Sequence, residues 1–276
     1  MIKVEEFPFV DLNLARRLER TEAQVNAEMV EARAKIFPDS NAQWIEVAGA
    51  YAMYDGLTSP LTQTFGLGIF GSITEQEIGL IEDFYNSLSA PIFHEVSPLA
   101  DLTLLPLLNN RGYQPIEFTS VMFRPISHNP MLEVSSNIQV RLIEESEQDL
   151  WAATSAKGWS EFTEYADLMF DLAQVSAKRR GALSFIAELE GQPIATGAVG
   201  IFNGVALLAG ASTIVEGRRQ GAQQALLNSR LNYAVEQGCD IAMVCAQPGS
   251  VSQRNAERQG FRIAYTRVKW RLARAV

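Results

Sequence analysis

The spacing of hydrophobic residues in the first half of the chain changes between a helical and an extended pattern. Over residues 11–36, apolar side chains recur every three or four positions among charged ones, which predicts a helix that ends before Pro38. Thr74 and Glu77 have the spacing of a capping box and predict the start of another helix. Runs rich in strand-forming residues predict strands over residues 44–54, 64–70 and 117–124.

The second half contains more strand-like runs. They cover residues 138–143, 183–190, 193–202, 205–213, 240–246 and 262–272, and helical patterns cover 147–155, 164–177, 221–237 and 252–259. The turns Glu190-Gly191-Gln192 and Asn203-Gly204 predict that the three strands they join form an antiparallel meander. The predicted fold class is therefore α/β, of the α+β type.

The length of 276 residues favours two domains, because domains of roughly 100–150 residues can each bury a core. Residues 127–137 are rich in Ser, Asn and Pro and follow no period, so we predict domains at 1–128 and 138–276 with a linker at 129–137. Arg111-Gly112-Tyr113 resembles Gln259-Gly260-Phe261, and each glycine lies between a predicted helix and a predicted strand. This similarity suggests two copies of one fold.

Composition narrows the class of protein. Apolar residues make up 47% and charged residues 20%, and no run approaches the roughly 18 apolar residues of a membrane span, so no membrane partner is expected. The first residues lack the features of a secretory signal, which favours the cytoplasm. A net charge of −9 argues against a nucleic-acid partner and suits an amine-bearing substrate. Cys239 and Cys245 lack metal-ligand spacing and are expected to be reduced thiols, with no metal site.

The segment 213–227 carries the clearest chemical signal, because a predicted strand leads through a polar turn into a predicted helix. A helix start has unpaired N–H groups and partial positive charge, and therefore binds phosphate well. Gly221 would let the backbone approach a ligand, while Arg218 and Arg219 add positive charge. The alternative, a plain helix start with two solvated arginines, stays open from this segment alone.

Two motifs resemble the GNAT superfamily of N-acetyltransferases. The family pattern is a strand ending in Val-x-Pro, then Arg or Gln-x-x-Gly-x-Gly or Ala; this chain has Thr213-x-Val215, then Arg218-x-x-Gly221-x-Gln223. Gln223 departs from the small residue of that pattern. Residues 252–261, Ser-Gln-Arg-Asn-Ala-Glu-Arg-Gln-Gly-Phe, resemble a helix of the branch that acetylates ribosomal protein N-termini and related amines.

The resemblance implies two tandem GNAT-like domains, each a mixed, mostly antiparallel twisted sheet flanked by helices. The N-terminal copy looks degenerate, because its matching helix start at residues 70–77 has no arginine. The C-terminal copy would transfer an acetyl group from acetyl-coenzyme A to a primary amine, which attacks the thioester directly. The resemblance implies a coenzyme site for pantetheine and pyrophosphate at Thr213, Ile214, Val215, Arg218, Arg219, Gln220, Gly221, Ala222, Gln223 and Gln224.

Ser252 matches the residue that acts as the acid in the ribosomal-protein branch, so we predict that it protonates the departing thiolate. Its alternative is a helix N-cap. Glu161, Glu164 and Glu188 are candidate bases, and a water chain is another. The acceptor would be a small-molecule amine or a peptide. A non-catalytic acyl-coenzyme A sensor and an interaction protein of two inactive copies stay open as alternatives, as does a homodimer.

Overall fold

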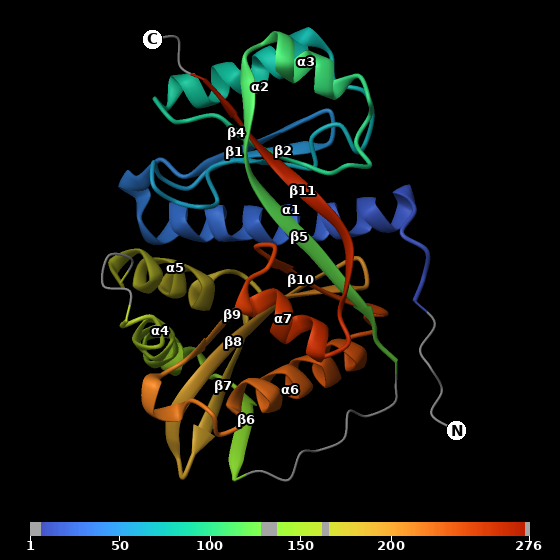
Figure 1. Cartoon of the computed structure of the whole chain (residues 1–276). Helices are drawn as coiled ribbons and strands as arrows, with labels where there is room; N and C mark the ends of the chain where they lie inside the picture. Colours follow the sequence, from blue (N-terminus) through green and yellow to red (C-terminus); the bar gives the residue numbers. More distant parts are fainter. Residues whose placement is uncertain (1–6, 128–136, 162–165, 274–276) are drawn as a thin grey trace. The chain divides into compact units, whose positions relative to one another are not determined.

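The computed structural model describes residues 7–127, 137–161 and 166–273. The chain divides into two units, which differ from the predicted domains. The first unit combines Met1–Arg124 with Met243–Val276, and the second unit is Pro125–Ala242. Figure 1 shows the helices and strands of both units.

The first unit contains a mixed sheet with the strand order β1-β2-β3-β4-β11-β5, and β10 follows β5. Strands β3 and β4 are parallel, whereas β11 is antiparallel to both of its neighbours, β4 and β5. The strands are β1 (Gln43–Val47), β2 (Ala50–Tyr54), β3 (Thr64–Phe65), β4 (Phe93–Val96), β5 (Tyr113–Pro125), β10 (Ile241–Ala246), which crosses the boundary between the units, and β11 (Arg262–Leu272).

Helices cover both faces of this sheet. Successive side chains of β2 point to opposite faces and so contribute to two cores, one on each face. Tyr51 and Met53 pack with Ala27 and Val30 of α1 on one face. On the other face, the core that contains Ala52 also holds side chains of α2 and α3. The helices of the first unit are α1 (Leu12–Ile36), η1 (Pro38–Ser40), α2 (Glu75–Ser87), α3 (Leu104–Asn110) and α7 (Val251–Arg258).

Two strand predictions in the first unit are corrected by the structure. The predicted strand 44–54 is a hairpin, because Ala48 and Gly49 have φ angles of 48° and 81° and reverse the chain between β1 and β2. The predicted strand 64–70 ends at Phe65, since Gly66 takes a φ of 75°, which a strand does not allow. Strand β4 was not predicted at all. The predicted helix 11–36 is confirmed, as is the capping box of Thr74 and Glu77.

The second unit is built on an antiparallel meander in the order β9-β8-β7-β6. The predicted hairpin turns are confirmed: Glu190 and Gly191 have φ angles of 51° and 75°, and Asn203 and Gly204 have 48° and 73°. Both residues of each turn are thus left-handed, which matches the twist of the strands they join. The strands are β6 (Ile138–Leu142), β7 (Leu183–Leu189), β8 (Gln192–Phe202) and β9 (Val205–Thr213).

Helices pack on the two faces of this meander. Ile186 of β7 packs in a core with Trp151 of α4 and Ala173 of α5. Its neighbour Phe185 points the other way and makes an edge-to-face ring contact with Tyr233 of α6, at 5.6 Å between centroids. The helices are η2 (Glu145–Glu147), α4 (Gln148–Lys157), α5 (Ala166–Lys178), η4 (Val215–Gly217) and α6 (Ala222–Glu236). The predicted α+β class with mostly antiparallel strands is confirmed.

The C-terminal segment explains why the units differ from the predicted boundaries at 1–128, 129–137 and 138–276. Gly112 and Gly260 have φ angles of 83° and 82° and precede β5 and β11, as the sequence similarity suggested. These two strands pair with each other over their length, from Arg262↔Phe123 to Leu272↔Tyr113. Residues 243–276 therefore complete the sheet of the first unit. Of the predicted linker, all but Asn137 lies outside the described residues.

Within the part of the chain that the structure describes, no helix combines the length and the apolar character that a membrane crossing requires.

Candidate functional site

The turn between β9 and α6 is fixed against the neighbouring strand β8. Thr213 is the last residue of β9 and pairs with Ala195, and the N–H of Ile214 donates to the carbonyl of Ile194 at 3.0 Å. A Cβ on Gly217 would lie 2.7 Å from the Cβ of Ile194, so only glycine fits at the end of η4. The turn therefore starts from a rigid position.

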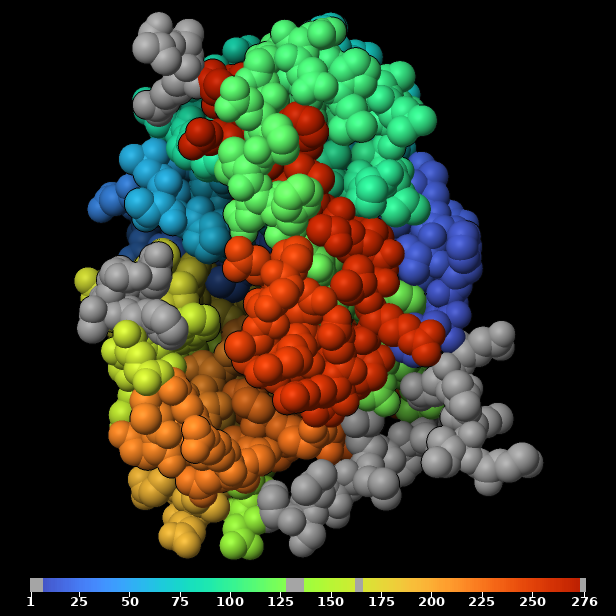
Figure 2. Space-filling model, viewed as in Figure 1, coloured from blue at the N-terminus to red at the C-terminus, as the bar shows by residue number. Residues whose placement is uncertain are grey.

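The N-terminus of α6 follows two residues in left-handed conformations. Arg219 has a φ of 62°, and Gly221, the N-cap residue, has a φ of 87°. No side chain caps this helix end and its first turn contains no acidic residue. A Cβ on Gly221 would meet no atom within 4 Å, and this turn contributes to the orange surface in Figure 2. The N–H groups of the first turn are thus left without a side-chain cap, and the phosphate site there stays a prediction.

Arg218 is engaged by an acid in this structure. Its NH1 donates to Oε2 of Glu161 at 2.5 Å, and its NH2 lies 3.4 Å from the carbonyl oxygen of Gly158. Both side chains are partly exposed, so the pair is a weak one by itself. A predicted phosphate ligand and a predicted base therefore neutralise each other here.

Gln223 and Gln224 make local hydrogen bonds, although Gln223 is exposed. Nε2 of Gln223 donates to the carbonyl of Ser212 at 3.0 Å and to Oγ1 of Thr213 at 2.6 Å. Gln224 bonds to Oδ1 of Asn228 one turn further along α6, at 2.8 Å. The side chain that departs from the family pattern therefore covers the end of β9, where the pantetheine arm is predicted.

The other predicted residues of this segment have local roles. Nε2 of Gln220 donates to the carbonyl of Glu216 at 2.9 Å. Ala222 is buried at the start of α6, and Val215 begins η4 with 44% of its surface exposed. All ten predicted coenzyme residues therefore lie on one continuous segment, from the last residue of β9 to the first turn of α6. Their contacts with a coenzyme stay a prediction.

The C-terminal end of α4 is pressed against the end of β9. A Cβ on Gly158 would lie 1.8 Å from Oγ of Ser212, and that hydroxyl donates to the carbonyl of Ser155 at 2.7 Å. Because Gly158 has an ordinary φ, the close approach of Ser212, and not the backbone conformation, requires a glycine here. The loop that follows α4 is thereby held close to Thr213.

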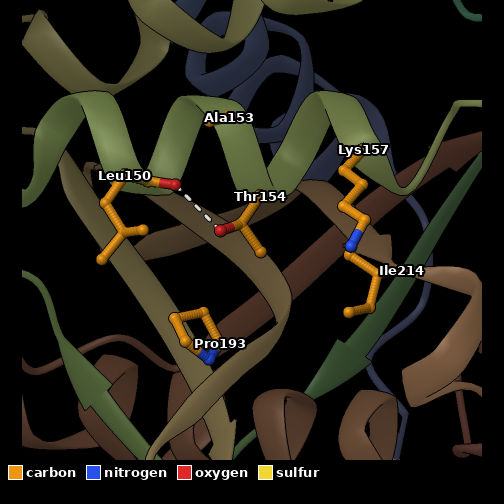
Figure 3. Close-up of a pocket in the computed structure, with 6 residues that line it drawn as sticks. All are labelled: Leu150, Ala153, Thr154, Lys157, Pro193 and Ile214. Carbon is orange, nitrogen blue, oxygen red and sulfur yellow. Dashed lines mark hydrogen bonds between the residues drawn. The ribbon is translucent and has the colours of Figure 1, made fainter.

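A pocket of about 220 Å³ opens beside this contact, between α4 and the ends of β8 and β9 (Figure 3). Leu150, Thr154 and Lys157 point into it from successive turns of α4, with Oγ1 of Thr154 bonded to the carbonyl of Leu150 at 2.8 Å. The lining is Leu150, Ala153, Thr154, Lys157, Pro193 and Ile214. The predicted coenzyme residue Ile214 thus turns its side chain to this pocket.

Arg230 is a residue of this region that the sequence analysis missed. It lies on α6 with 4% of its surface exposed and bonds to backbone carbonyls of β8 and β9. A signal was present in the sequence, because buried positions of α6 recur every four residues at Ala222, Leu226, Arg230 and Ala234. An arginine on such a stripe indicates a specific polar partner inside the unit.

Ser252, the predicted acid, lies on α7 in the first unit and is exposed. It is not the N-cap of this helix. That position is taken by Ser250, whose hydroxyl accepts from the N–H of Gln253 at 3.1 Å. The alternative reading of Ser252 as an N-cap is therefore wrong, and its catalytic role stays a prediction.

The candidate bases are held by arginines where the structure describes them. Glu161 bonds to Arg218, and Oε1 of Glu188 accepts from NH2 of Arg141 at 2.7 Å. Arg141 also binds Glu147, and this hydrogen bond lowers the pKa of Glu147 to about 2. Glu164 lies outside the described residues. In this structure both described candidates are engaged by arginines, and a water chain stays open as the alternative base.

Neither cysteine is part of a disulfide, and Cys239 is buried. Across residues 7–127, 137–161 and 166–273, no three His, Cys, Asp or Glu side chains are grouped so that they could hold a metal ion.

Comparison with known proteins gives a family match and a fold match. Residues 144–261 match the model of the acetyltransferase (GNAT) family. A GCN5-related N-acetyltransferase from Kribbella flavida has a TM-score of 0.61 at 16% identity, over 90% of this chain and 96% of that chain. A tandem GNAT protein from the clavulanic acid biosynthesis pathway has a TM-score of 0.60 at 11% identity, over 96% of this chain and 98% of that chain.

A third solved structure, a GCN5-related N-acetyltransferase from Sphaerobacter thermophilus, has a TM-score of 0.54 at 16% identity and covers 91% of each chain. At these identities the similarity concerns the fold. No curated protein sequence matches the chain. The fold similarity extends over both halves of the chain, whereas the family match covers the segment from η2 to the turn after α7.

Proposed function

We propose that the protein transfers an acetyl group from acetyl-coenzyme A to a primary amine, because residues 144–261 match the model of the acetyltransferase (GNAT) family. The amine nitrogen attacks the thioester carbon and forms the C–N bond. The C–S bond then breaks, the nitrogen loses a proton, and the thiolate takes one up. The products are an acetamide and coenzyme A.

The observation that carries this proposal is the uncapped N-terminus of α6. Gly221 places it directly after a turn with two arginines, and no acidic residue of the first turn competes for its N–H groups. The pyrophosphate of the coenzyme would bind there through backbone N–H groups of residues 219–224. The pantetheine arm would then lie along the end of β9, at Thr213 to Val215.

We further propose Ser252 as the acid that protonates the thiolate. A substitution of Ser252 by Ala removes the hydroxyl from an exposed position on α7, so it should cut turnover without weakening coenzyme binding. The base is either a carboxylate released from its arginine or a chain of water molecules. Unchanged turnover in the Ser252→Ala variant would remove this residue from the mechanism.

Titration calorimetry with acetyl-coenzyme A tests the coenzyme site directly. Binding should weaken as salt is raised, because Arg218 and Arg219 contribute charge to an exposed site. Absence of heat would contradict every coenzyme-binding function. Thiol release with a panel of small amines and N-terminal peptides then tests the transfer reaction.

A second function, an acyl-coenzyme A sensor without turnover, is favoured by two contacts. Gln223 covers the end of β9, and Glu161 neutralises Arg218. A sensor would bind acetyl-coenzyme A and release no thiol above the rate without protein, for every amine tested. Either function is compatible with the predicted cytoplasmic location, and the net charge of −9 favours a cationic acceptor for the enzyme.

A further inference from the structure

The meander of the second unit is interrupted by a β-bulge where β8 faces β9. Thr196 pairs with Ser212 and Ala198 pairs with Ala209, so one residue of β8, Gly197, lies opposite two residues of β9. Those two residues are Gly210, with a φ of 60°, and Ala211. Ala209, Gly210 and Ala211 are exposed although the residues before and after them on β9 are buried. The bulge thus presents a short length of backbone at the surface.

Arg230 holds this bulge from the side of α6. Its NH1 lies 3.3 Å from the carbonyl oxygens of both Ala198 and Ala209, the pair that flanks the bulge. Its Nε donates to the carbonyl of Leu226 at 3.2 Å, which fixes the guanidinium on its own helix. One side chain therefore links α6 with two strands at the point where their register changes.

The strand makes room for this arginine. A Cβ on Gly197 would lie 2.9 Å from Cζ and NH1 of Arg230, so any larger residue would displace the guanidinium. Burial lowers the pKa of Arg230 to about 10, which still leaves it charged at neutral pH. Within the described residues it forms no ion pair with a carboxylate. Its positive charge is therefore balanced by carbonyl dipoles and by no carboxylate in that part of the chain, an arrangement that costs stability.

We propose that Arg230 is a positioning residue for acetyl transfer, which fixes the bulge of β9 and polarises the Ala209–Gly210 peptide towards the thioester carbonyl. This inference rests on the proposed function. In a trans peptide the N–H points away from the C=O, so the carbonyl bonded to Arg230 directs the N–H of Gly210 away from α6. A hydrogen bond at the carbonyl also makes that N–H a stronger donor.

The distance along β9 agrees with this role. A pantetheine arm that starts at Thr213 and runs back along the strand reaches Gly210 after three residues, about 10 Å at the usual rise of a strand. The buried cation lies behind that peptide, where it favours the negative charge that develops on the thioester oxygen. The residue would thus act through the backbone without touching the substrate.

The test uses the full-length protein with acetyl-coenzyme A labelled with ¹³C at the acetyl carbonyl. Isotope-edited infrared spectroscopy measures the carbonyl stretch, which falls when a donor polarises the carbonyl. We expect the wild-type protein to lower this stretch relative to free acetyl-coenzyme A. Arg230→Met should return most of it towards the free value, while the Kd for coenzyme A, which lacks the carbonyl, stays within about threefold.

Arg179→Met is the matched control. Arg179 is also buried, at 6% exposed, and its NH2 donates to the carbonyl of Val199 on β8 at 2.6 Å, next to the bulge pair. It should lose comparable stability but keep the wild-type stretch. Arg230→Lys, which retains the charge but not the planar fork, should give an intermediate stretch, and serves if Arg230→Met does not fold.

Three results would overturn the proposal. The stretch of Arg230→Met, or of Arg230→Lys if the former is unfolded, could equal that of the wild type. Both Arg230→Met and Arg179→Met could lose the shift equally, which would indicate general loosening of the unit. Failure of the wild-type protein to bind acetyl-coenzyme A would overturn the proposed function as well, and the calorimetric trace distinguishes this case from the other two.

Discussion

Helices α2 and α6 follow corresponding strands in the two halves of the chain, but their N-termini are built differently. At α2, Oγ1 of Thr74 accepts from the N–H of Glu77 at 3.2 Å, and the Glu77 carboxylate accepts from the N–H of Thr74 at 2.8 Å. At α6, Gly221 occupies the same position and offers no side chain. The first helix start therefore satisfies its own donors, and the second leaves them for a ligand.

The surroundings of the two helix starts sharpen this contrast. In the first half, Phe70 packs closely against Gly49, because a Cβ on Gly49 would lie only 2.8 Å from the Cβ of Phe70. The guanidinium of Arg20 lies 4.2 Å from the centroid of the Phe70 ring. The place that corresponds to the phosphate turn is thus filled by an aromatic side chain. In the second half, the space above Gly221 is open. The comparison supports the prediction that the N-terminal copy binds no coenzyme.

Two buried arginines, one in each unit, also differ in whether their partners are carboxylates or backbone carbonyls. In the first unit, Arg267 is 1% exposed and bonds to Glu22, and its Nε lies 3.6 Å from the carboxylate of Glu19. In the second unit, Arg230 bonds only to carbonyls within the described residues. The first unit therefore neutralises the charge of Arg267 internally, whereas the second keeps a positive charge beneath the exposed bulge of β9.

The largest expected effect concerns the buried acid of the first unit. Burial raises the pKa of Glu19 from 4.5 to about 7, while Arg267 and a hydrogen bond from Tyr265 oppose the rise, and Glu22 and Glu95 add to it. The folded protein therefore keeps this proton to a higher pH than the unfolded chain does. The contribution of Glu19 to the free energy of unfolding is fully present below about pH 4.5 and is lost as the pH rises to about 7. A pKa change of this size corresponds to about 3 kcal/mol.

Glu19→Gln removes the titrating group and keeps the shape of the side chain. We expect its free energy of unfolding, measured with urea between pH 4.5 and 7.5, to fall much less with pH than that of the wild type. Coenzyme binding should not change, because Glu19 belongs to the other unit. A pH slope equal to that of the wild type would show that Glu19 does not carry this dependence.

The next effect would come from giving α6 a feature of α2. Gln224 is the third residue of α6, as Glu77 is the third of α2, so Gln224→Glu places a carboxylate among the open N–H groups. It should compete with the pyrophosphate and cost about 1.5–3 kcal/mol of coenzyme A binding, roughly a 10- to 150-fold higher Kd. Calorimetry measures the Kd, and the helix itself should become slightly more stable.

Gln237→Glu makes the same chemical change at the C-cap of α6 and is the control for charge alone. It should leave the Kd for coenzyme A unchanged and slightly destabilise the helix, because a negative charge there opposes the helix dipole. If both variants weaken binding equally, the net charge of the protein and not the helix start controls affinity.

A smaller effect is expected at α2, where the cap has a structural use only. Thr74→Ala removes the hydroxyl that caps the helix and should lower the free energy of unfolding by about 1 kcal/mol. Thr74→Ser keeps the hydroxyl and should be close to the wild type. Neither variant should change the Kd for coenzyme A, and a change in that Kd would contradict the assignment of the coenzyme site to α6.

The sequence predicted the features whose cause is local. Gly204 after Asn203, and Gly221 before a helix, take left-handed conformations that these residue types favour, so both turns were visible. The hairpin at Ala48-Gly49 was missed because alanine rarely adopts a φ of 48°.

Features that depend on contacts distant in sequence could not be predicted. The pairing of β11 with β5 joins residues about 150 positions apart, and it moved residues 243–276 into the first unit. The role of Arg230 depends on a bulge that exists only once β8 and β9 are paired. The sequence showed that Gln223 departs from the family pattern, but it did not show where the side chain points. The rotamer decides whether this side chain contacts a ligand or β9.

The smallest expected effect tests that departure. Gln223→Ala frees the carbonyl of Ser212 and the hydroxyl of Thr213 from the bonds that now cover them. If these bonds compete with the pantetheine arm, the coenzyme must break them in order to bind, at a cost of about 1 kcal/mol. Removing them should therefore lower the Kd for coenzyme A about fivefold. Gln220→Ala is the matched control, since Gln220 bonds to Glu216 and does not touch β9. Weaker binding by Gln223→Ala would instead mean that Gln223 holds the end of β9 in the form that the coenzyme needs. Both helix starts would then depend on a side chain, Thr74 at α2 and Gln223 at α6, and would differ in which groups that side chain binds.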